Sequence, residues 1–292
     1  MTAPPFPRLE LVRDALARLY RGLGGDRVRG FAVSVLPAQV AWDEDEDPAA
    51  AVRRIVRVMA EHLGLPPAPV SVRFLAMAEA AWVELAEGPG YAVDLHERFA
   101  GERRDLGAVL AHEMTHVFLH RAGLSVPDTE ENEVLTDTAA SYLGAGWLLL
   151  DAFREDALST QRLGYLTPEE FGYVLAKRAD AFGEDPRVWF TSPQAYEAYG
   201  RGRALAARDA GRPPLAAAGP AARAGYAARR TLALRAEAPA GGASYAFEPG
   251  AAGGPAHVTF DCPVCCGRLR LPVRGRLRAR CGRCGTVLDC DT

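Results

Sequence analysis

The stretch LAHEMTHVFLH, residues 110–120, places two imidazoles and a carboxylate at a spacing that suits metal chemistry. On a helix, His112 and His116 lie one turn apart on the same face, so both rings can reach one ion. Glu113 projects beside them, where its carboxylate can accept a proton from a water molecule without ligating the ion. The alternative is a helix that merely carries polar residues. His120 continues the stripe, but it lies about 12 Å from His112 along a straight helix, so we expect a packing or solvent-facing role for it.

A second segment, NEVLTD at 132–137, supplies the carboxylates that such a site needs. Glu133 is a candidate third ligand. Asp137, one helical turn further on, is a candidate hydrogen-bond partner for a ligating histidine. Two histidines and one glutamate leave a fourth coordination position open, which is the ligand set of a catalytic zinc site. The sequence therefore predicts Zn²⁺ held by His112, His116 and Glu133.

All six cysteines fall within residues 262–292, and four of them form two C-x-x-C pairs that are separated by 15 residues. This spacing suits a tetrahedral site of four thiolates in a zinc ribbon. Four thiolates leave no open position, so this second Zn²⁺ would be structural, and the module should unfold without it. The remaining two cysteines are expected to be spare thiols. The four predicted ligands are Cys262, Cys265, Cys281 and Cys284.

The elements expected around the central motif define an α+β domain. Its helices follow apolar stripes at helical spacing, and its strands are short runs bounded by turn residues. The turn EGPG makes the last two strands a predicted hairpin, and Thr167 with Glu170 predicts a capping box at one helix start. Helices are expected at 8–21, 48–63, 103–121, 128–153, 167–182 and 192–208, and strands at 30–36, 70–76, 80–86 and 91–95.

The length, net charge and apolar patterning of the chain limit the class of protein. The chain has 292 residues, enough for a sizeable core, and its formal net charge of −3 excludes a chain that binds polyanions along its whole length. We find no secretory signal and no apolar run of bilayer length, so we expect no membrane association and a cytoplasmic location. The predicted organisation is a catalytic domain at 1–209, a linker rich in Pro, Gly and Ala at 210–256, and the ribbon at 257–292.

The pairing of HEMTH with NEVLTD resembles the gluzincin class of zinc metallopeptidases, the thermolysin-like group. LTDTAASYLGAG and GYLTPEEFGYVLA are also similar to a group of poorly characterised bacterial H-E-x-x-H proteins. The resemblance implies a zincin-like fold, with a mixed sheet, an active-site helix and a helical second half. It implies that His112, His116 and Glu133 are zinc ligands, that Glu113 is the general base, and that Asp137 orients His112.

Peptide-bond hydrolysis is the activity that this set of residues implies. Zinc would lower the pKa of its water towards about 7, and Glu113 would take the proton and pass it to the leaving amine. The substrate peptide would pair with an edge strand. The oxyanion needs one further donor. Tyr142 is the preferred candidate for that donor, with Tyr165 and His96 as alternatives.

Three other functions stay open. The domain could cut a single partner protein, such as a repressor, with the ribbon as an adaptor. It could also be a non-catalytic binding module. The presence of Glu113 argues against this, because a site that has lost catalysis has no need of a general base. The ribbon holds seven arginines against three aspartates, so it could contact nucleic acid or an acidic protein. Phe260 is its only aromatic residue, which leaves little for base stacking.

Overall fold

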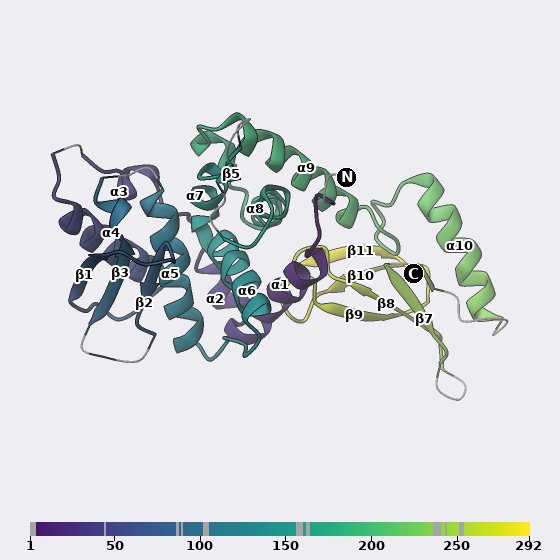
Figure 1. The fold of residues 1–292 in the computed structure, drawn as a ribbon. Helices are drawn as coiled ribbons and strands as arrows, with labels where there is room; N and C mark the ends of the chain where they lie inside the picture. The colour runs from purple at the N-terminus through teal and green to yellow at the C-terminus, as the bar shows by residue number, and fades with distance from the viewer. Residues whose placement is uncertain are drawn as a thin grey trace. The chain divides into compact units, whose positions relative to one another are not determined.

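The computed structural model describes residues 4–43, 45–85, 88, 90–101, 105–155, 160–161, 164–235, 241–242, 244–250 and 254–292. The chain forms two compact units, Met1–Gly202 and Arg203–Thr292. Both combine helices with short sheets, so the predicted α+β class is confirmed (Figure 1). None of the helices in the described ranges is long and apolar enough to cross a membrane.

The sheet of the first unit has three strands in the order β1-β3-β2. The strands are β1 (Val70–Leu75), β2 (Ala81–Val83) and β3 (Tyr91–His96). β2 and β3 pair antiparallel, as the predicted hairpin requires, whereas β1 runs parallel to β3. β2 is consequently an edge strand. The EGPG turn expected between β2 and β3 lies partly outside the described residues. Helices α4 (Pro48–His62) and α5 (Leu106–Arg121) pack beside this sheet (Figure 1).

Helix α5 carries the H-E-x-x-H motif, and its apolar side chains fix its orientation. Leu106, Leu110, Met114 and Val117 are fully buried, and burial of each stabilises the fold by about 1.5–3 kcal/mol. They turn the opposite face of α5 towards α6 (Thr129–Ala140), which packs against it. The side chain of Asp128 caps α6 by accepting a hydrogen bond from the Glu131 amide.

The helix expected at 128–153 is interrupted. After α6 come one π turn (Ser141–Ala145) and then α7 (Gly146–Asp151). Gly144 adopts a φ of 118°, which a residue with a side chain rarely tolerates. A Cβ there would also lie 3.0 Å from the Cα of Ser34. Close approach of another segment therefore breaks this helix.

That other segment corrects a further prediction, because residues 30–36 do not form the expected strand. The carbonyl groups of Phe31 and Ala32 accept hydrogen bonds from the guanidinium of Arg178. The Val35 amide donates to the Gly144 carbonyl. A buried arginine thus satisfies backbone groups that we expected to pair with a neighbouring strand.

Helix α8 (Pro168–Phe182) begins with the predicted capping box. The Glu170 amide donates to the Thr167 hydroxyl, and the Glu170 carboxylate accepts from the Thr167 amide. The remaining elements of this unit are short, apart from α1 and α9. They are α1 (Leu9–Leu23), α2 (Gly25–Arg29), α3 (Pro37–Val40), 3₁₀ turns at Glu97–Ala100 and Pro186–Trp189, β4 (Arg154–Glu155), β5 (Thr160–Gln161) and α9 (Pro193–Ala210), whose last turns belong to the second unit.

The second unit contains more structure than the expected linker and ribbon. Within 210–256 the chain forms α10 (Pro220–Leu234), β6 (Gly241–Gly242) and β7 (Tyr245–Glu248). β7 pairs with β8 of the ribbon, and Tyr226 of α10 packs against the rings of Tyr245 and Phe247. These aromatic residues give the Ala-rich segment a small core. The ribbon strands are β8 (His257–Asp261), β9 (Arg268–Pro272), β10 (Arg276–Arg280) and β11 (Val287–Asp291).

Candidate metal centres

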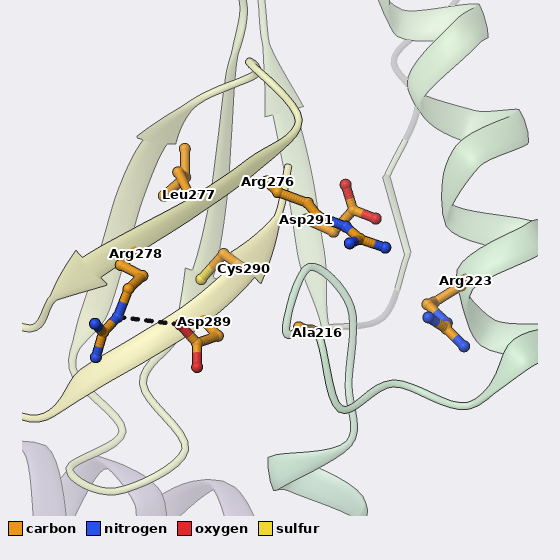
Figure 2. A pocket seen from close by; sticks show the side chains of 8 residues that line it. All are labelled: Ala216, Arg223, Arg276, Leu277, Arg278, Asp289, Cys290 and Asp291. Atoms are coloured by element: carbon orange, nitrogen blue, oxygen red, sulfur yellow. Dashed lines mark ion pairs between the residues drawn. The ribbon is translucent and has the colours of Figure 1, made fainter.

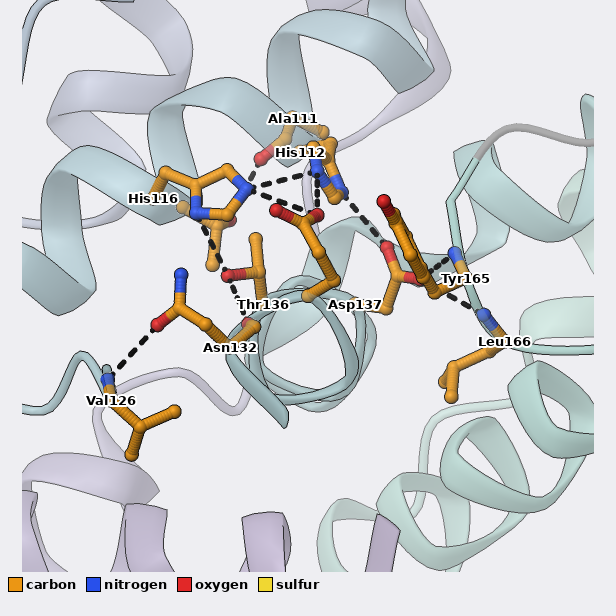
Figure 3. A network of polar contacts seen from close by, with 11 residues as sticks. Ala111, His112, His116, Val126, Asn132, Thr136, Asp137, Tyr165 and Leu166 are labelled. Atoms are coloured by element: carbon orange, nitrogen blue, oxygen red, sulfur yellow. Dashed lines mark hydrogen bonds and ion pairs between the residues drawn. The ribbon is translucent and has the colours of Figure 1, made fainter. Parts of the chain in front are cut away.

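The first candidate centre joins the facing sides of α5 and α6. The Nε2 atoms of His112 and His116 lie 3.0 Å apart, and Oε2 of Glu133 lies 3.2 Å and 3.4 Å from them. Tetrahedral bonds of about 2.05 Å would separate two ligand atoms by about 3.3 Å. The three atoms are therefore spaced as ligands of one ion (Figure 3).

Hydrogen bonds on the outer ring nitrogens fix both tautomers. Nδ1 of His112 lies 2.8 Å from Oδ1 of Asp137, a carboxylate that accepts a hydrogen bond. Nδ1 of His116 lies 3.1 Å from the Thr136 hydroxyl, which gives its own proton to the Asn132 carbonyl and so accepts from the ring. In their neutral forms both imidazoles consequently carry the proton on Nδ1, and each directs an Nε2 lone pair at the other. Two lone pairs 3.0 Å apart repel each other, so this close approach is stable only when a cation lies between them.

The electrostatics of the centre also favour a cation. Burial alone would raise the pKa of Glu133, but hydrogen bonds with His112 and His116 outweigh burial and lower this pKa to about 2. Burial would lower the pKa of His112, but its bonds to Asp137 and Glu133 raise it well above the usual value. The carboxylates of Asp137 and Glu133 thus stabilise positive charge between the two rings, which a bound cation would supply.

The centre opens into a cavity of about 440 Å³. Glu113 lines the cavity beside His112, and its partial burial raises its pKa, an effect that the neighbouring histidines oppose. Much of the remaining lining is apolar and comes from β2 with its flanking residues and from the first turn of α5. This arrangement gives the ligand set an open side that a substrate can enter. The apolar residues that line it are Ala80, Ala81, Trp82, Val83, Leu85, Ala108 and Val109.

Gly164 allows the backbone to approach the fully buried carboxylate of Asp137. Oδ2 of Asp137 accepts hydrogen bonds from the amides of Tyr165 and Leu166, at 2.5 Å and 3.1 Å (Figure 3). Gly164 has a φ of 89°, and a Cβ on it would lie 2.6 Å from both carboxylate oxygens. Only glycine leaves this carboxylate in contact with the two amides and with His112.

We expect Gly164→Ala to weaken metal binding at this centre by about 10- to 100-fold, because it displaces the carboxylate that orients His112. Stepwise chelator competition on the cobalt-substituted protein would measure the affinity, since only the cysteine cluster gives thiolate charge-transfer bands. Gly183→Ala is the matched control. Gly183 has a similar φ of 77° but no atom within 4 Å of its Cβ position. Equal affinities in both variants would contradict the proposed role of Gly164.

The other residues considered from the sequence lie elsewhere. Tyr142 is completely buried, its hydroxyl lies 2.8 Å from that of Tyr20, and it does not line the cavity. His96 accepts a hydrogen bond from the Arg98 amide at the start of a 3₁₀ turn. His120 is exposed at the end of α5. Of the three tyrosine and histidine candidates for the oxyanion donor, only Tyr165 lines the cavity.

Sequence reasoning missed two supporting residues. Thr136 positions His116, and its signal is its place on α6, one turn after Glu133. The signal for Gly164 is weaker, because a glycine before a tyrosine predicts a turn but not what the turn approaches.

The second candidate centre is the cluster of Cys262, Cys265, Cys281 and Cys284, all of them buried. The Sγ atoms of Cys262 and Cys284 lie 3.7 Å apart, and those of Cys265 and Cys281 lie 3.6 Å apart. Zn–S bonds of about 2.3 Å would separate tetrahedral sulfurs by about 3.8 Å. The hydrogen bonds among the four thiols lower the pKa values of Cys281 and Cys284 and raise those of Cys262 and Cys265. The spacing of the four sulfurs is therefore the evidence for a metal site.

Two equivalent turns hold the four sulfurs. The amides of Cys266 and Gly285 donate to the carbonyls of Cys262 and Cys281, four residues earlier in each case. Cys266 has a φ of 52° and Gly285 a φ of 78°, so Cys266 occupies a position that suits glycine. Neither Cys266 nor Cys290 joins the cluster. Burial raises the pKa of Cys290 to about 11, which makes this thiol unreactive.

Acidic side chains accompany several of the ribbon arginines. Arg268 pairs with Asp261, Arg270 with Glu248 and Arg278 with Asp289. Figure 2 shows the Arg278–Asp289 pair beside a cavity of about 500 Å³ that Arg276 and Asp291 also line. These pairs are exposed, so their contribution to stability is small. They do lower the net positive charge that this face presents to an anionic partner.

Comparisons with known proteins give no match: no protein family model, no curated protein and no solved structure is detectably similar to this chain. Its function must therefore be inferred from its own residues.

Proposed function

We propose that this protein is a zinc-dependent peptidase that hydrolyses peptide bonds, with a zincin-like first unit and a second, structural zinc in its ribbon. One observation carries the proposal above all others. Two Nε2 lone pairs and one carboxylate converge at ligand spacing beside an open cavity that Glu113 also lines. A three-ligand site with an accessible fourth position is the arrangement of catalytic zinc, whereas structural zinc is enclosed by four ligands.

Zinc bound there would supply an acidified water molecule and a positive charge beside the substrate carbonyl. The chain's own residues then divide the remaining tasks. Glu113 receives a proton from the attacking water and returns it to the leaving nitrogen. Burial raises the pKa of Glu113, which makes its carboxylate a stronger base for the first step. Asp137 and Thr136 keep the two imidazoles in the tautomers that leave Nε2 unprotonated.

The edge strand β2 supports a peptide as the substrate. β2 pairs on one side with β3, and no strand in the described part of the chain pairs with its other side. Its residues also line the cavity. An extended peptide could add to this edge through main-chain hydrogen bonds, which would carry its scissile bond past Glu113. The apolar wall suits an apolar side chain on the peptide.

Metal content of the full-length protein, measured by mass spectrometry of zinc, tests the proposal first. We expect two zinc ions per chain, and one in the double variant His112→Ala/His116→Ala. His120→Ala is the matched control, since it removes an exposed imidazole from the same helix and should retain both ions. One zinc ion in all three proteins would remove the catalytic centre from the proposal.

Cleavage is tested next with the oxidised insulin B chain, an unstructured peptide, by mass spectrometry of its products. We expect cleavage by the zinc-loaded protein and none by the double variant. Two bound zinc ions without cleavage would favour the second candidate, a domain that acts on one specific partner.

A further inference from the structure

The cavity contains one tyrosine whose position suits a role in the chemistry. Tyr165 lines it together with His112, Glu113 and Glu133, and the residue is 40% exposed. In Figure 3 the backbone of Tyr165 lies next to the Asp137 carboxylate, and its ring extends from there towards His112. No hydrogen bond of its hydroxyl to another described residue is found, so the hydroxyl can donate to a ligand in the cavity.

The backbone of Tyr165 is tied to the metal centre through one side chain. Asp137 accepts the Tyr165 amide on Oδ2 and the His112 ring on Oδ1. Two hydrogen bonds therefore connect the tyrosine backbone to a metal ligand. Because Asp137 is completely buried, the connection is shielded from water and is stiff. The backbone of Tyr165 is thus held close to His112, and its side chain extends from there into the cavity.

Hydrolysis of an amide needs a donor at this place. As the water oxygen bonds to the carbonyl carbon, the electron pair of the C=O bond moves to oxygen and leaves a negative charge there. The pair returns when the C–N bond breaks, and Glu113 delivers the proton from the attacking water to the departing nitrogen. The carboxylates of Glu79, Glu113 and Glu133 cannot donate to this oxygen when ionised, and the Nδ1 protons of both histidines are already used.

Three side chains that line the cavity retain a proton to donate: the Tyr165 hydroxyl, the Asn132 amide and the Trp82 indole. Trp82 alternates along β2 with the buried Ala81 and Val83 and is 46% exposed, so its indole projects from the opposite face of the strand. Oδ1 of Asn132 accepts from the Val126 amide, and its backbone carbonyl accepts from Thr136, the partner of Nδ1 on His116. Asn132 is thus placed on the outer side of His116, behind its Nδ1. A phenol is also a more acidic donor than an amide or an indole.

We propose that Tyr165 is a catalytic residue that donates a hydrogen bond to the carbonyl oxygen as it becomes negatively charged. It keeps its own proton throughout, so no further reactant is needed. This inference rests on the proposed peptidase function and assigns the role for which the sequence favoured Tyr142.

The test compares zinc-loaded, full-length Tyr165→Phe with the unaltered protein on the oxidised insulin B chain. Loss of one oxyanion donor should lower kcat by about 10²- to 10³-fold and leave KM nearly unchanged. Phenylalanine keeps the ring and both amide bonds to Asp137, so zinc content should stay at two. Tyr196→Phe, which removes an exposed tyrosine hydroxyl, is the control and should keep the full kcat.

Inhibitor affinity supplies a readout that does not depend on turnover. N-phosphoryl-Leu-Trp presents a tetrahedral oxyanion, whereas mercaptoacetyl-Leu-Trp binds through sulfur and presents none. Tyr165→Phe should weaken the first by about 10- to 100-fold and leave the second unchanged. Equal weakening of both inhibitors, or a larger kcat loss in Asn132→Ala or Tyr142→Phe, would overturn the assignment. Failure of the peptidase proposal looks different, because the unaltered protein would then neither cleave the peptide nor bind the phosphoryl compound.

Discussion

Replacement of Glu113 by glutamine should lower kcat for peptide hydrolysis by about 10²- to 10⁴-fold while the protein keeps both zinc ions. Glutamine fills the same space beside His112 but cannot accept the proton of the attacking water. Glu113 is not among the three residues whose ligand atoms converge, so the ion should remain bound. Single-turnover cleavage of the oxidised insulin B chain, with zinc content measured on the same sample, checks both parts.

Glu97→Gln is the matched control for that experiment, because it removes an exposed carboxylate near the end of β3 and should leave kcat unaltered. Two outcomes would contradict the assignment. Retained hydrolysis in Glu113→Gln would exclude Glu113 as the base. Loss of one zinc ion would show that this carboxylate is a ligand, and the open fourth position would then be filled.

Local pattern was enough to predict the elements that hold the candidate site. The helix under His112, the hairpin of β2 and β3 and the capping box at Thr167 each depend on residues close together in the chain. The ligand candidates share this property, since His112 and His116 are separated by one helical turn. Their meeting with Glu133 depends on a helix pair joined by a short loop, which limits how the two helices can pack.

Contacts between distant segments could not be predicted in this way. The break at Gly144 depends on Ser34, and the irregular backbone at 30–36 depends on Arg178. The sequence around Ser34 or Arg178 does not indicate these contacts. A buried arginine in a helix cannot be distinguished from an exposed one by sequence alone. The choice between Tyr142 and Tyr165 as oxyanion donor also depends on contacts between distant segments. Tyr142 follows Asp137 closely in the sequence, but a hydrogen bond across 28 residues holds the Tyr165 backbone at Asp137, and Tyr165 lines the cavity.

Amino-acid composition also failed to predict the structure of residues 210–256. The residues between 210 and 256 have the Pro, Gly and Ala content of a flexible linker. A few aromatic side chains are nonetheless enough to pack α10 on β7, since Tyr226 contacts both Tyr245 and Phe247. Such sparse contacts cannot stabilise many residues alone, so an ion held by the four-cysteine cluster would matter for the stability of this unit.

Replacement of Cys265 by serine should therefore remove the ribbon zinc and unfold residues 257–292. A serine hydroxyl is a poor zinc ligand at neutral pH, and the free energy of metal binding is the folding free energy of so small a module. We expect zinc content to fall from two to one per chain. Hydrogen exchange followed by mass spectrometry should show lost protection in β8–β11 and unaltered protection in α5 and α6, whose folding does not depend on this ion.

Cys266→Gly is the control that separates ligation from the mere loss of a cysteine next to the first knuckle. Cys266 lies outside the cluster and has a φ of 52°, so glycine removes its thiol and also relieves an unfavourable backbone conformation. This variant should keep both zinc ions and show equal or greater protection of the ribbon. If Cys265→Ser kept two zinc ions with a folded ribbon, or if Cys266→Gly lost one, the four-thiolate assignment would be wrong.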